Sequence, residues 1–236
     1  MSNSYFKFKQ FTIEQYDCAM KVGTDGCLLG GWFNCSGSCR ILDIGTGSGL
    51  IAIMAAQRSN AYITGIEIDA SAARQARENA DNSPWGNRIE IIDEDLLKYN
   101  PAELFDTIVS NPPYFVNSLK CNDNSRTLAR HSDSLGSDAF FKKAGKLLTD
   151  TGKISIIIPC DIEKEWRSSA NSHRFVPSRI TYIKTTPRKE AKRVLIEFSK
   201  GDRIECNENI LVLENRPGVY SEDAQKILRD FYLKIM

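Results

Sequence analysis

Apolar and polar positions follow a regular pattern from residue 40 onward. Short apolar runs rich in β-branched residues are typical of buried strands, and the segments between them have the apolar spacing of helices. The predicted strands cover residues 40–45, 61–69, 88–93, 105–110, 153–158, 179–185, 193–198 and 210–213. The predicted helices cover residues 48–59, 70–81, 137–148 and the stretch from 221 to the chain end. Strands that alternate with helices predict a parallel sheet covered by helices on both faces.

The later strands break this alternation. A basic turn at Pro187, Arg188 and Lys189 joins two of them without a helix, which predicts an antiparallel hairpin at the sheet edge. We therefore predict an α/β fold with a seven-stranded, mostly parallel sheet. No internal repeat, low-complexity stretch or linker interrupts the pattern, so we expect a single domain over residues 1–236. Its expected parts are an N-terminal extension that covers the binding site (1–39), a core (40–200), and a C-terminal strand and helix (201–236).

Composition and charge narrow the class of protein. The chain has 31 basic and 30 acidic residues and a net charge of +1, so no global field marks it as a nucleic-acid binder. Its 7 cysteines have irregular spacing without a secretory leader, and the lone pair Cys35 and Cys39 lacks the partners of a zinc site. The longest apolar run, 50–56, is too short to span a bilayer. We expect a cytoplasmic protein with reduced thiols, without metal, membrane association or an obligate protein partner.

A glycine-rich turn follows the first predicted strand. In the sequence DIGTGSG, Gly45 and Gly47 allow a tight turn that brings a ligand close to the N-terminus of the next helix. The spacing differs from the GxGxxG of dinucleotide sites, and Asp43 would repel a pyrophosphate. A carboxylate there suits a ligand with an ammonium group, such as S-adenosylmethionine, which carries no phosphate.

Acidic residues also follow the next two strands. Glu67 lies about 20 residues after the glycines, where a carboxylate can accept hydrogen bonds from ribose hydroxyls. Asp95 comes after the third strand, where it could accept from the exocyclic amine of an adenine. Helix capping is the alternative for these acids, and Asp69, directly before the helix at 70–81, is the best candidate for a plain cap.

The fourth strand ends at Asn111, Pro112, Pro113 and Tyr114, where the prolines exclude any further strand. Together with the glycine turn and the acids, this tetrapeptide resembles the class I S-adenosylmethionine-dependent methyltransferases, in particular those that methylate a planar nitrogen. The resemblance implies a Rossmann-like fold and S-adenosylmethionine as cofactor. It also implies a clamp in which the Asn111 side-chain oxygen and the Pro112 carbonyl accept both protons of the target amine. Pro113 would stiffen these acceptors, and Tyr114 would stack on the flat substrate.

Both ends of the chain are similar to a narrower family, the bacterial tRNA1(Val) (adenine(37)-N6)-methyltransferases. The similar segments are FKFKQFTIEQYDCAMKVGTDGCLLGGW, NPPYF, ARHSDSL, KTTPRKEAKRVLIEF and DFYLKI. This resemblance implies that the substrate is tRNA and the target the N6 amine of the adenine beside the anticodon. Alternatives with the same clamp are a glutamine-N5 or a guanine-N2 methyltransferase, and a further alternative is a catalytically silent RNA-binding module. A dehydrogenase agrees least with the acids and the tetrapeptide.

The resemblance also suggests roles outside the core motifs. Thr24 and Asp25 would lie near the methionine end of the cofactor, where Asn111 also contributes, although an ordinary turn explains Thr24 and Asp25 equally well. A locally basic stretch over 179–203 predicts RNA-phosphate contacts, unless it is only a solvated edge. The expected RNA-binding residues are Arg130, Arg188, Lys189, Lys192 and Arg193.

Overall fold

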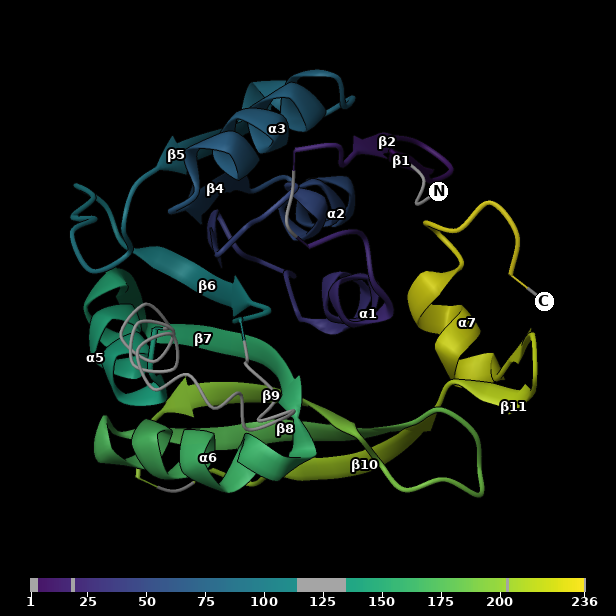
Figure 1. Cartoon of the computed structure of the whole chain (residues 1–236). Coiled ribbons are helices and arrows are strands. Elements are labelled where there is room, and N and C mark those ends of the chain that lie inside the picture. The colour runs from purple at the N-terminus through teal and green to yellow at the C-terminus, as the bar shows by residue number, and fades with distance from the viewer. Residues whose placement is uncertain (1–3, 18–19, 114–134, 203, 236) are drawn as a thin grey trace, which may run out of the picture.

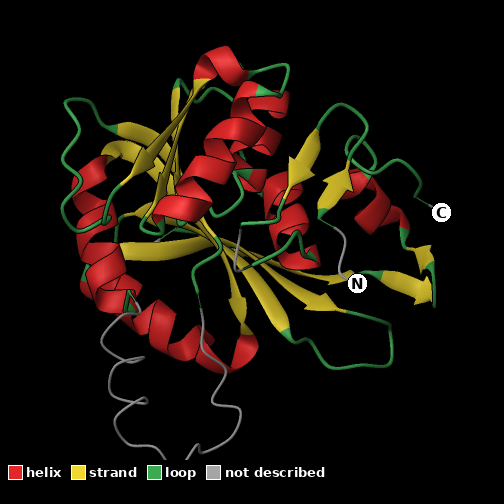
Figure 2. Ribbon diagram, turned by 45° about the horizontal axis from the view of Figure 1, so that its top comes forward, coloured by secondary structure: helices red, strands yellow, loops and turns green. Residues whose placement is uncertain are grey.

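The computed structural model describes residues 4–17, 20–113, 135–202 and 204–235. In this part of the chain a central sheet is covered by helices on both faces (Figures 1 and 2). Helices α1 (Thr24–Trp32), α2 (Leu50–Arg58), α3 (Ala70–Asp81) and α7 (Glu222–Leu228) lie on one face, and α5 (Ser137–Leu147) and α6 (Glu163–Ser172) lie on the other. The predicted α/β layers are confirmed.

Within the described residues the sheet has eight strands in the order β10-β8-β9-β7-β6-β3-β4-β5. The parallel part consists of β3 (Arg40–Ile44), β4 (Tyr62–Glu67), β5 (Ile89–Asp93), β6 (Phe105–Ser110) and β7 (Leu148–Pro159). The remaining strands are β8 (Phe175–Lys184), β9 (Arg193–Lys200) and β10 (Asn207–Val212). Because β3, β4, β5 and β6 are parallel, their carboxyl ends meet at one edge, where ligands bind in open α/β sheets.

The late strands differ from the prediction in one respect. The β8–β9 hairpin is antiparallel as predicted, but β9 lies inside the sheet between β7 and β8. The last strand, β10, pairs in parallel with β8 and forms the edge, so the described sheet has eight strands rather than seven. The connection between the parallel strands β8 and β10 includes β9 itself, which pairs on the other side of β8, an arrangement that no local apolar pattern reveals.

Most of the predicted core elements occur within one or two residues of their expected bounds. Helix α3 begins and ends as predicted, and the Asp69 side chain caps it by accepting from the backbone N–H groups of Ser71 and Ala72. The last helix is shorter than expected, because it ends at Leu228. The elements without a predicted counterpart include α1, α6 and a small N-terminal hairpin of β1 (Tyr5–Lys7) and β2 (Thr12–Glu14). A second unpredicted hairpin consists of β11 (Glu214–Arg216) and β12 (Val219–Tyr220).

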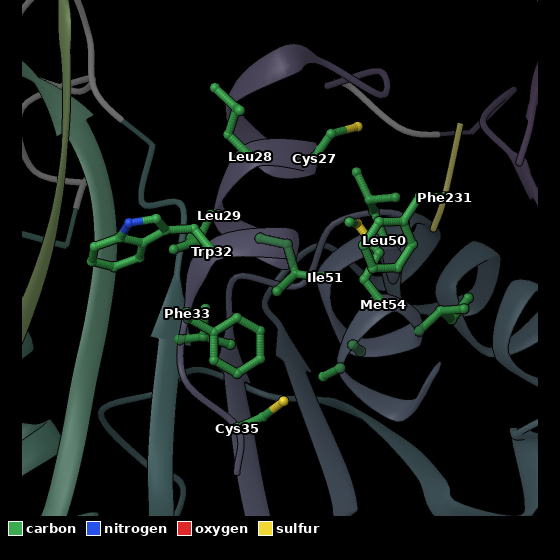
Figure 3. Close-up of a cluster of buried hydrophobic side chains, with 14 of the residues drawn as sticks. Cys27, Leu28, Leu29, Trp32, Phe33, Cys35, Leu50, Ile51, Met54 and Phe231 are labelled. Carbon is green, nitrogen blue, oxygen red and sulfur yellow. The ribbon is translucent and has the colours of Figure 1, made fainter. Parts of the chain in front are cut away.

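Helix α1 packs between two other helices through consecutive glycines. A Cβ on Gly30 would lie 2.6 Å from the sulfur of Met54 in α2, and one on Gly31 would lie 2.5 Å from the backbone oxygen of Ile227 in α7. Figure 3 shows the result: side chains of α1, including Leu29, gather with α2 and Phe231 in one buried cluster. The missing side chains let three helices approach closely on the face of the sheet that carries the N-terminal segment.

The two chain ends meet on this same side of the molecule. The backbone N–H of Lys9 donates to the carbonyl of Phe231 at 2.8 Å. The rings of Phe6 and Phe8 lie 6.1 and 6.0 Å from the ring of Tyr232. The N-terminal hairpin therefore packs against residues from the very end of the chain (Figure 1).

Within the described ranges, no helix has the length and apolar character needed to cross a membrane. The same ranges contain no group of three or more His, Cys, Asp or Glu side chains placed to hold a metal ion. Cys35 and Cys39 are free thiols.

Candidate active site

The structure places five of the predicted cofactor residues, Asp43, Gly45, Gly47, Glu67 and Asn111, at the carboxyl ends of β3, β4 and β6. The turn after β3 has positive φ values of 69° at Gly45 and 56° at Gly47, a conformation that favours glycine. Apart from the chain neighbours, no heavy atom of a described residue lies within 4 Å of a Cβ built on either glycine, so the turn faces open space in this part of the structure. The N–H groups of Gly45 and Thr46 donate to the carbonyl of Ile66, which fixes the turn to the end of β4.

Asp43 lies beneath this turn and is completely buried. Its Oδ2 accepts from the Thr46 hydroxyl at 2.6 Å and from the Ala52 N–H at 3.1 Å, while Oδ1 has no hydrogen-bond partner among the described residues. Burial raises the pKa of Asp43 to about 7, against the smaller opposing effect of these two hydrogen bonds. The carboxyl group thus holds the glycine turn on helix α2, and a contact of Oδ1 with a ligand stays a prediction.

Glu67 joins the ends of β3 and β4. Its Oε2 accepts from the Gly47 N–H at 2.9 Å, and its Oε1 accepts from the N–H groups of Ile68 and Asp69. The next residue, Ile68, is 70% exposed, which is unusual for a large apolar side chain. The sequence reading missed Ile68, whose only signal is an apolar residue directly after the acid at a strand end.

Asp95 has the capping role that the sequence analysis gave as the alternative to cofactor binding. Its Oδ1 accepts from the N–H of Leu97 at 2.9 Å and so caps the turn after β5. Leu97 itself is 51% exposed, a second large apolar group beside a predicted cofactor residue. The capping bond uses one oxygen of Asp95, and its contact with an adenine amine stays a prediction.

The end of β6 carries the predicted clamp. The Ser110 hydroxyl donates to the carbonyl of Ile44 at 2.8 Å, which ties the end of β6 to the end of β3. Asn111 follows, and its Oδ1 is buried without a hydrogen-bond partner among the described residues. Pro112 is buried, whereas Pro113 is exposed. Tyr114 lies outside the described residues. An acceptor without a partner beside the glycine turn is unusual in a folded protein and suits a donor brought by a ligand.

Thr24 and Asp25 form the first turn of α1, not an ordinary loop turn. Thr24 is exposed, and the Asp25 carboxylate accepts from the Arg193 Nε at 2.7 Å. Arg193 opens β9 directly opposite Pro159 at the end of β7. The structure therefore joins a predicted cofactor residue to a predicted RNA residue, a contact that sequence spacing gives no means to foresee.

The remaining predicted RNA-binding residues differ in their surroundings. Arg188, Lys189 and Lys192 are exposed in the β8–β9 loop, and Arg130 lies outside the described residues. Arg179, which also belongs to the basic stretch, has a different environment. Its guanidinium lies 3.7 Å from the ring centre of Trp32 and donates to the Glu197 carboxylate, so Arg179 packs α1 onto the sheet.

Comparison with known proteins agrees with this arrangement. The family model described as "Methyltransferase small domain" matches residues 28–166. A structure of a predicted O-methyltransferase from Agrobacterium tumefaciens superposes with a TM-score of 0.71 at 23% identity, covering 90% of this chain and 99% of that one. At this identity the similarity shows the fold alone, which is that of a class I methyltransferase.

Curated relatives match over their whole length. A tRNA1(Val) (adenine(37)-N6)-methyltransferase from Bacteroides fragilis is 46% identical over 100% of both chains. A protein of the same name from Trichodesmium erythraeum is 42% identical over 99% of this chain and 100% of the relative. The chain belongs to the methyltransferase small domain family and, within it, to the family of these relatives.

Proposed function

We propose that this protein transfers a methyl group from S-adenosylmethionine to the N6 amine of adenine 37 in tRNA1(Val). The full-length similarity to relatives of that name supports the substrate. One observation supports the chemistry most directly. The Oδ1 of Asn111 at the end of β6 is buried and has no hydrogen-bond partner among the described residues. We further propose that the chain acts as one domain in the cytoplasm, without a metal or an obligate protein partner.

The residues at the carboxyl edge fit S-adenosylmethionine. The open space over Gly45 and Gly47 leaves room for a ligand, and the nearby carboxylates suit its amine and ribose hydroxyls. We assign the ribose to Glu67, the adenine to Asp95, and the methionine end to Asp25 together with Thr24. The bound cofactor supplies a methyl group activated by a positive sulfonium. The exposed Ile68 and Leu97 provide apolar surface on which a flat adenine ring can pack.

The clamp explains how the chain could activate a weak nucleophile. The lone pair of an adenine amine is delocalised into the ring, so the nitrogen attacks poorly. When Asn111 Oδ1 and the Pro112 carbonyl accept its two protons, they favour a pyramidal nitrogen whose lone pair is free. The rigid Pro112 and Pro113 hold both acceptors in place before the substrate arrives, and such preorganisation lowers the barrier. Tyr114 would stack on the base.

Contacts with the RNA backbone would position the target adenine at the clamp. The exposed cations Arg188, Lys189 and Lys192 could contact phosphates, with Arg130 as a further candidate. Arg193 would contribute through the same edge while it pairs with Asp25. Adenine 37 lies in a loop, so its extrusion should cost less than flipping a base from a duplex.

The test uses an unmodified tRNA1(Val) transcript with methyl-labelled cofactor, followed by nucleoside analysis. We expect label in N6-methyladenosine at position 37. Asn111→Ala should lower kcat by about 100- to 1000-fold, the usual loss when one preorganised polar group at a reaction centre is removed. Cofactor affinity measured by calorimetry should stay within about twofold, because the clamp acts on the target amine and the other cofactor contacts remain in place.

Asn111→Asp is the matched control, because it keeps an acceptor oxygen at the same place and should retain more activity than the alanine variant. Label in N2-methylguanosine or in protein would favour the guanine or glutamine alternative. Absence of any label transfer, or full turnover by Asn111→Ala, would overturn the proposal.

A further inference from the structure

Two neighbouring loops carry basic side chains that do not contribute ion pairs or hydrogen bonds to the described fold. Lys184 ends β8, Arg188, Lys189 and Lys192 lie in the β8–β9 loop, and Arg216 lies in the hairpin formed by β11 (Glu214–Arg216) and β12 (Val219–Tyr220). None of these five side chains forms an ion pair or a hydrogen bond with another described residue. We call this set, Lys184, Arg188, Lys189, Lys192 and Arg216, the two-loop basic surface.

Other cations of the same strands have partners. Arg179 is 3.2 Å from the Glu197 carboxylate, Arg193 pairs with Asp25, and Lys200 donates to the Leu148 carbonyl at 2.9 Å. These side chains stabilise the sheet and helix α1. A basic stretch of sequence contains cations that stabilise the fold together with cations that are available to bind a ligand. The structure distinguishes the two kinds.

Backbone hydrogen bonds hold the two loops side by side. The Leu213 N–H donates to the Lys184 carbonyl at 2.8 Å, and the Glu214 N–H donates to the Thr185 carbonyl at 3.0 Å. Figure 1 accordingly shows β11 next to the loop that follows β8, and in Figure 2 both loops project from the same end of the sheet. The position of Arg216 relative to the β8–β9 loop is therefore fixed by the sheet.

The acid of the β11–β12 hairpin, Glu214, is hydrogen-bonded within the hairpin. Gly218, with a φ of 78°, donates its N–H to the Glu214 carboxylate at 3.2 Å. This bond engages the acid nearest to Arg216 within the turn, while Arg216 and the rest of the tip are exposed. An exposed guanidinium next to an internally bonded acid is available to an anion from outside.

The surface adjoins the candidate active site through β7. The Cys160 N–H, directly after the end of β7, donates to the Lys192 carbonyl at 3.2 Å. Strand β7 in turn pairs with β6, which ends one residue before Asn111. A polynucleotide with one base at Asn111 could therefore extend along the β8–β9 loop toward Arg216.

We propose that the two-loop basic surface binds backbone phosphates of the RNA that flank the methylated base, and that the β11–β12 hairpin contributes to it through Arg216. The inference rests on the proposed function for the identity of the RNA. Cations without internal partners bind phosphates by displacing condensed counterions, so each contact adds to the salt dependence of binding. Such contacts fix the register of the RNA and carry no base specificity.

Binding of a fluorescent unmodified tRNA1(Val) transcript, measured at several salt concentrations, tests the proposal. Arg216→Ala should weaken binding about two- to fivefold, as expected for one exposed ion pair. It should reduce the slope of log K against log salt by about 0.7 to 0.9, the value for one phosphate contact. Lys146→Ala, an exposed cation in the last turn of α5, is the matched control and should change neither quantity.

An unchanged affinity and slope for Arg216→Ala would overturn the proposal, as would an equal change for Lys146→Ala. The result is independent of catalysis. If Arg216→Ala lowers the slope although wild-type protein forms no N6-methyladenosine, the proposed function fails and the phosphate surface stands. If methylation occurs and Arg216→Ala binds like wild type, the phosphate surface alone fails.

Discussion

The buried carboxyl group of Asp43 should make stability depend on pH in a way that one substitution removes. Burial raises its pKa from the model-compound value of 3.8 to about 7 in the folded protein. Between these values the folded state keeps a proton that the unfolded state has lost. Unfolding then releases a proton, so the free energy of unfolding falls as pH rises through this window and levels off above pH 7.

The size of the effect follows from the shift. A difference of about 3 pKa units, at 1.36 kcal/mol for each unit, corresponds to about 4 kcal/mol between pH 4 and pH 8. Asp43→Asn cannot ionise, yet its amide oxygen can still accept from the Thr46 hydroxyl and the Ala52 N–H. We therefore expect the variant to lose less stability than wild type as the pH is raised.

Urea unfolding followed by tryptophan fluorescence, repeated from pH 4 to pH 8, measures this difference. The control is Asp69→Asn. Hydrogen bonds from Ser71 and Ala72 lower the pKa of the exposed Asp69 carboxylate from its ordinary value of 3.8, so its contribution to stability is present throughout this window and is lost only at lower pH. Asp69→Asn should therefore keep the wild-type slope between pH 4 and pH 8, whereas Asp43→Asn should flatten it. Parallel profiles for wild type and Asp43→Asn would refute the assignment of a raised pKa to Asp43.

Two further predictions concern helix α1. Gly31→Ala should lower the free energy of unfolding by about 1–3 kcal/mol, despite the better helix propensity of alanine, because its Cβ would meet the Ile227 carbonyl at 2.5 Å. Gly145→Ala, inside α5, is the matched control, because its Cβ would lie 3.4 Å from the Phe175 ring, an ordinary van der Waals distance. It should be neutral or slightly stabilising in the same urea assay, and an equal loss at both sites would contradict the packing argument. A double-mutant cycle of Asp25→Asn and Arg193→Met should give a coupling free energy of about 0.5–1 kcal/mol for the partly exposed ion pair, and a value of zero would argue against the pair in solution.

Much of the core could be predicted, because its helices and strands differ in apolar period. Helix α3 and strand β6 have the bounds that the pattern predicts, since a clear cap marks the helix and a nearly continuous buried run marks the strand. Helix α1 was missed because it is apolar on nearly all sides and contains Gly30 and Gly31, features that lower helix propensity and hide the period. Helix α6 buries only Trp166 and Ala170, too few positions for a pattern.

For the candidate site, the sequence predicts which residues belong to it but not all the contacts that they make. Strand-end motifs located Asp43, Glu67 and Asn111, because parallel strands bring their carboxyl ends together. They could not reveal that Asp43 lies beneath the glycine turn or that Asp25 pairs with Arg193, 168 positions away along the chain. The pair of Asp25 and Arg193 depends on how α1 packs on the sheet, which no local period encodes.

The contact between Lys9 and Phe231 has a consequence for biosynthesis. Phe6 and Lys9 leave the ribosome long before their partners, the ring of Tyr232 and the carbonyl of Phe231. The N-terminal segment must therefore wait, with Phe6 and Phe8 unburied on this side, until that later part of the chain has been made. A nascent chain stalled before Phe231 would expose an apolar surface of the kind that chaperones bind.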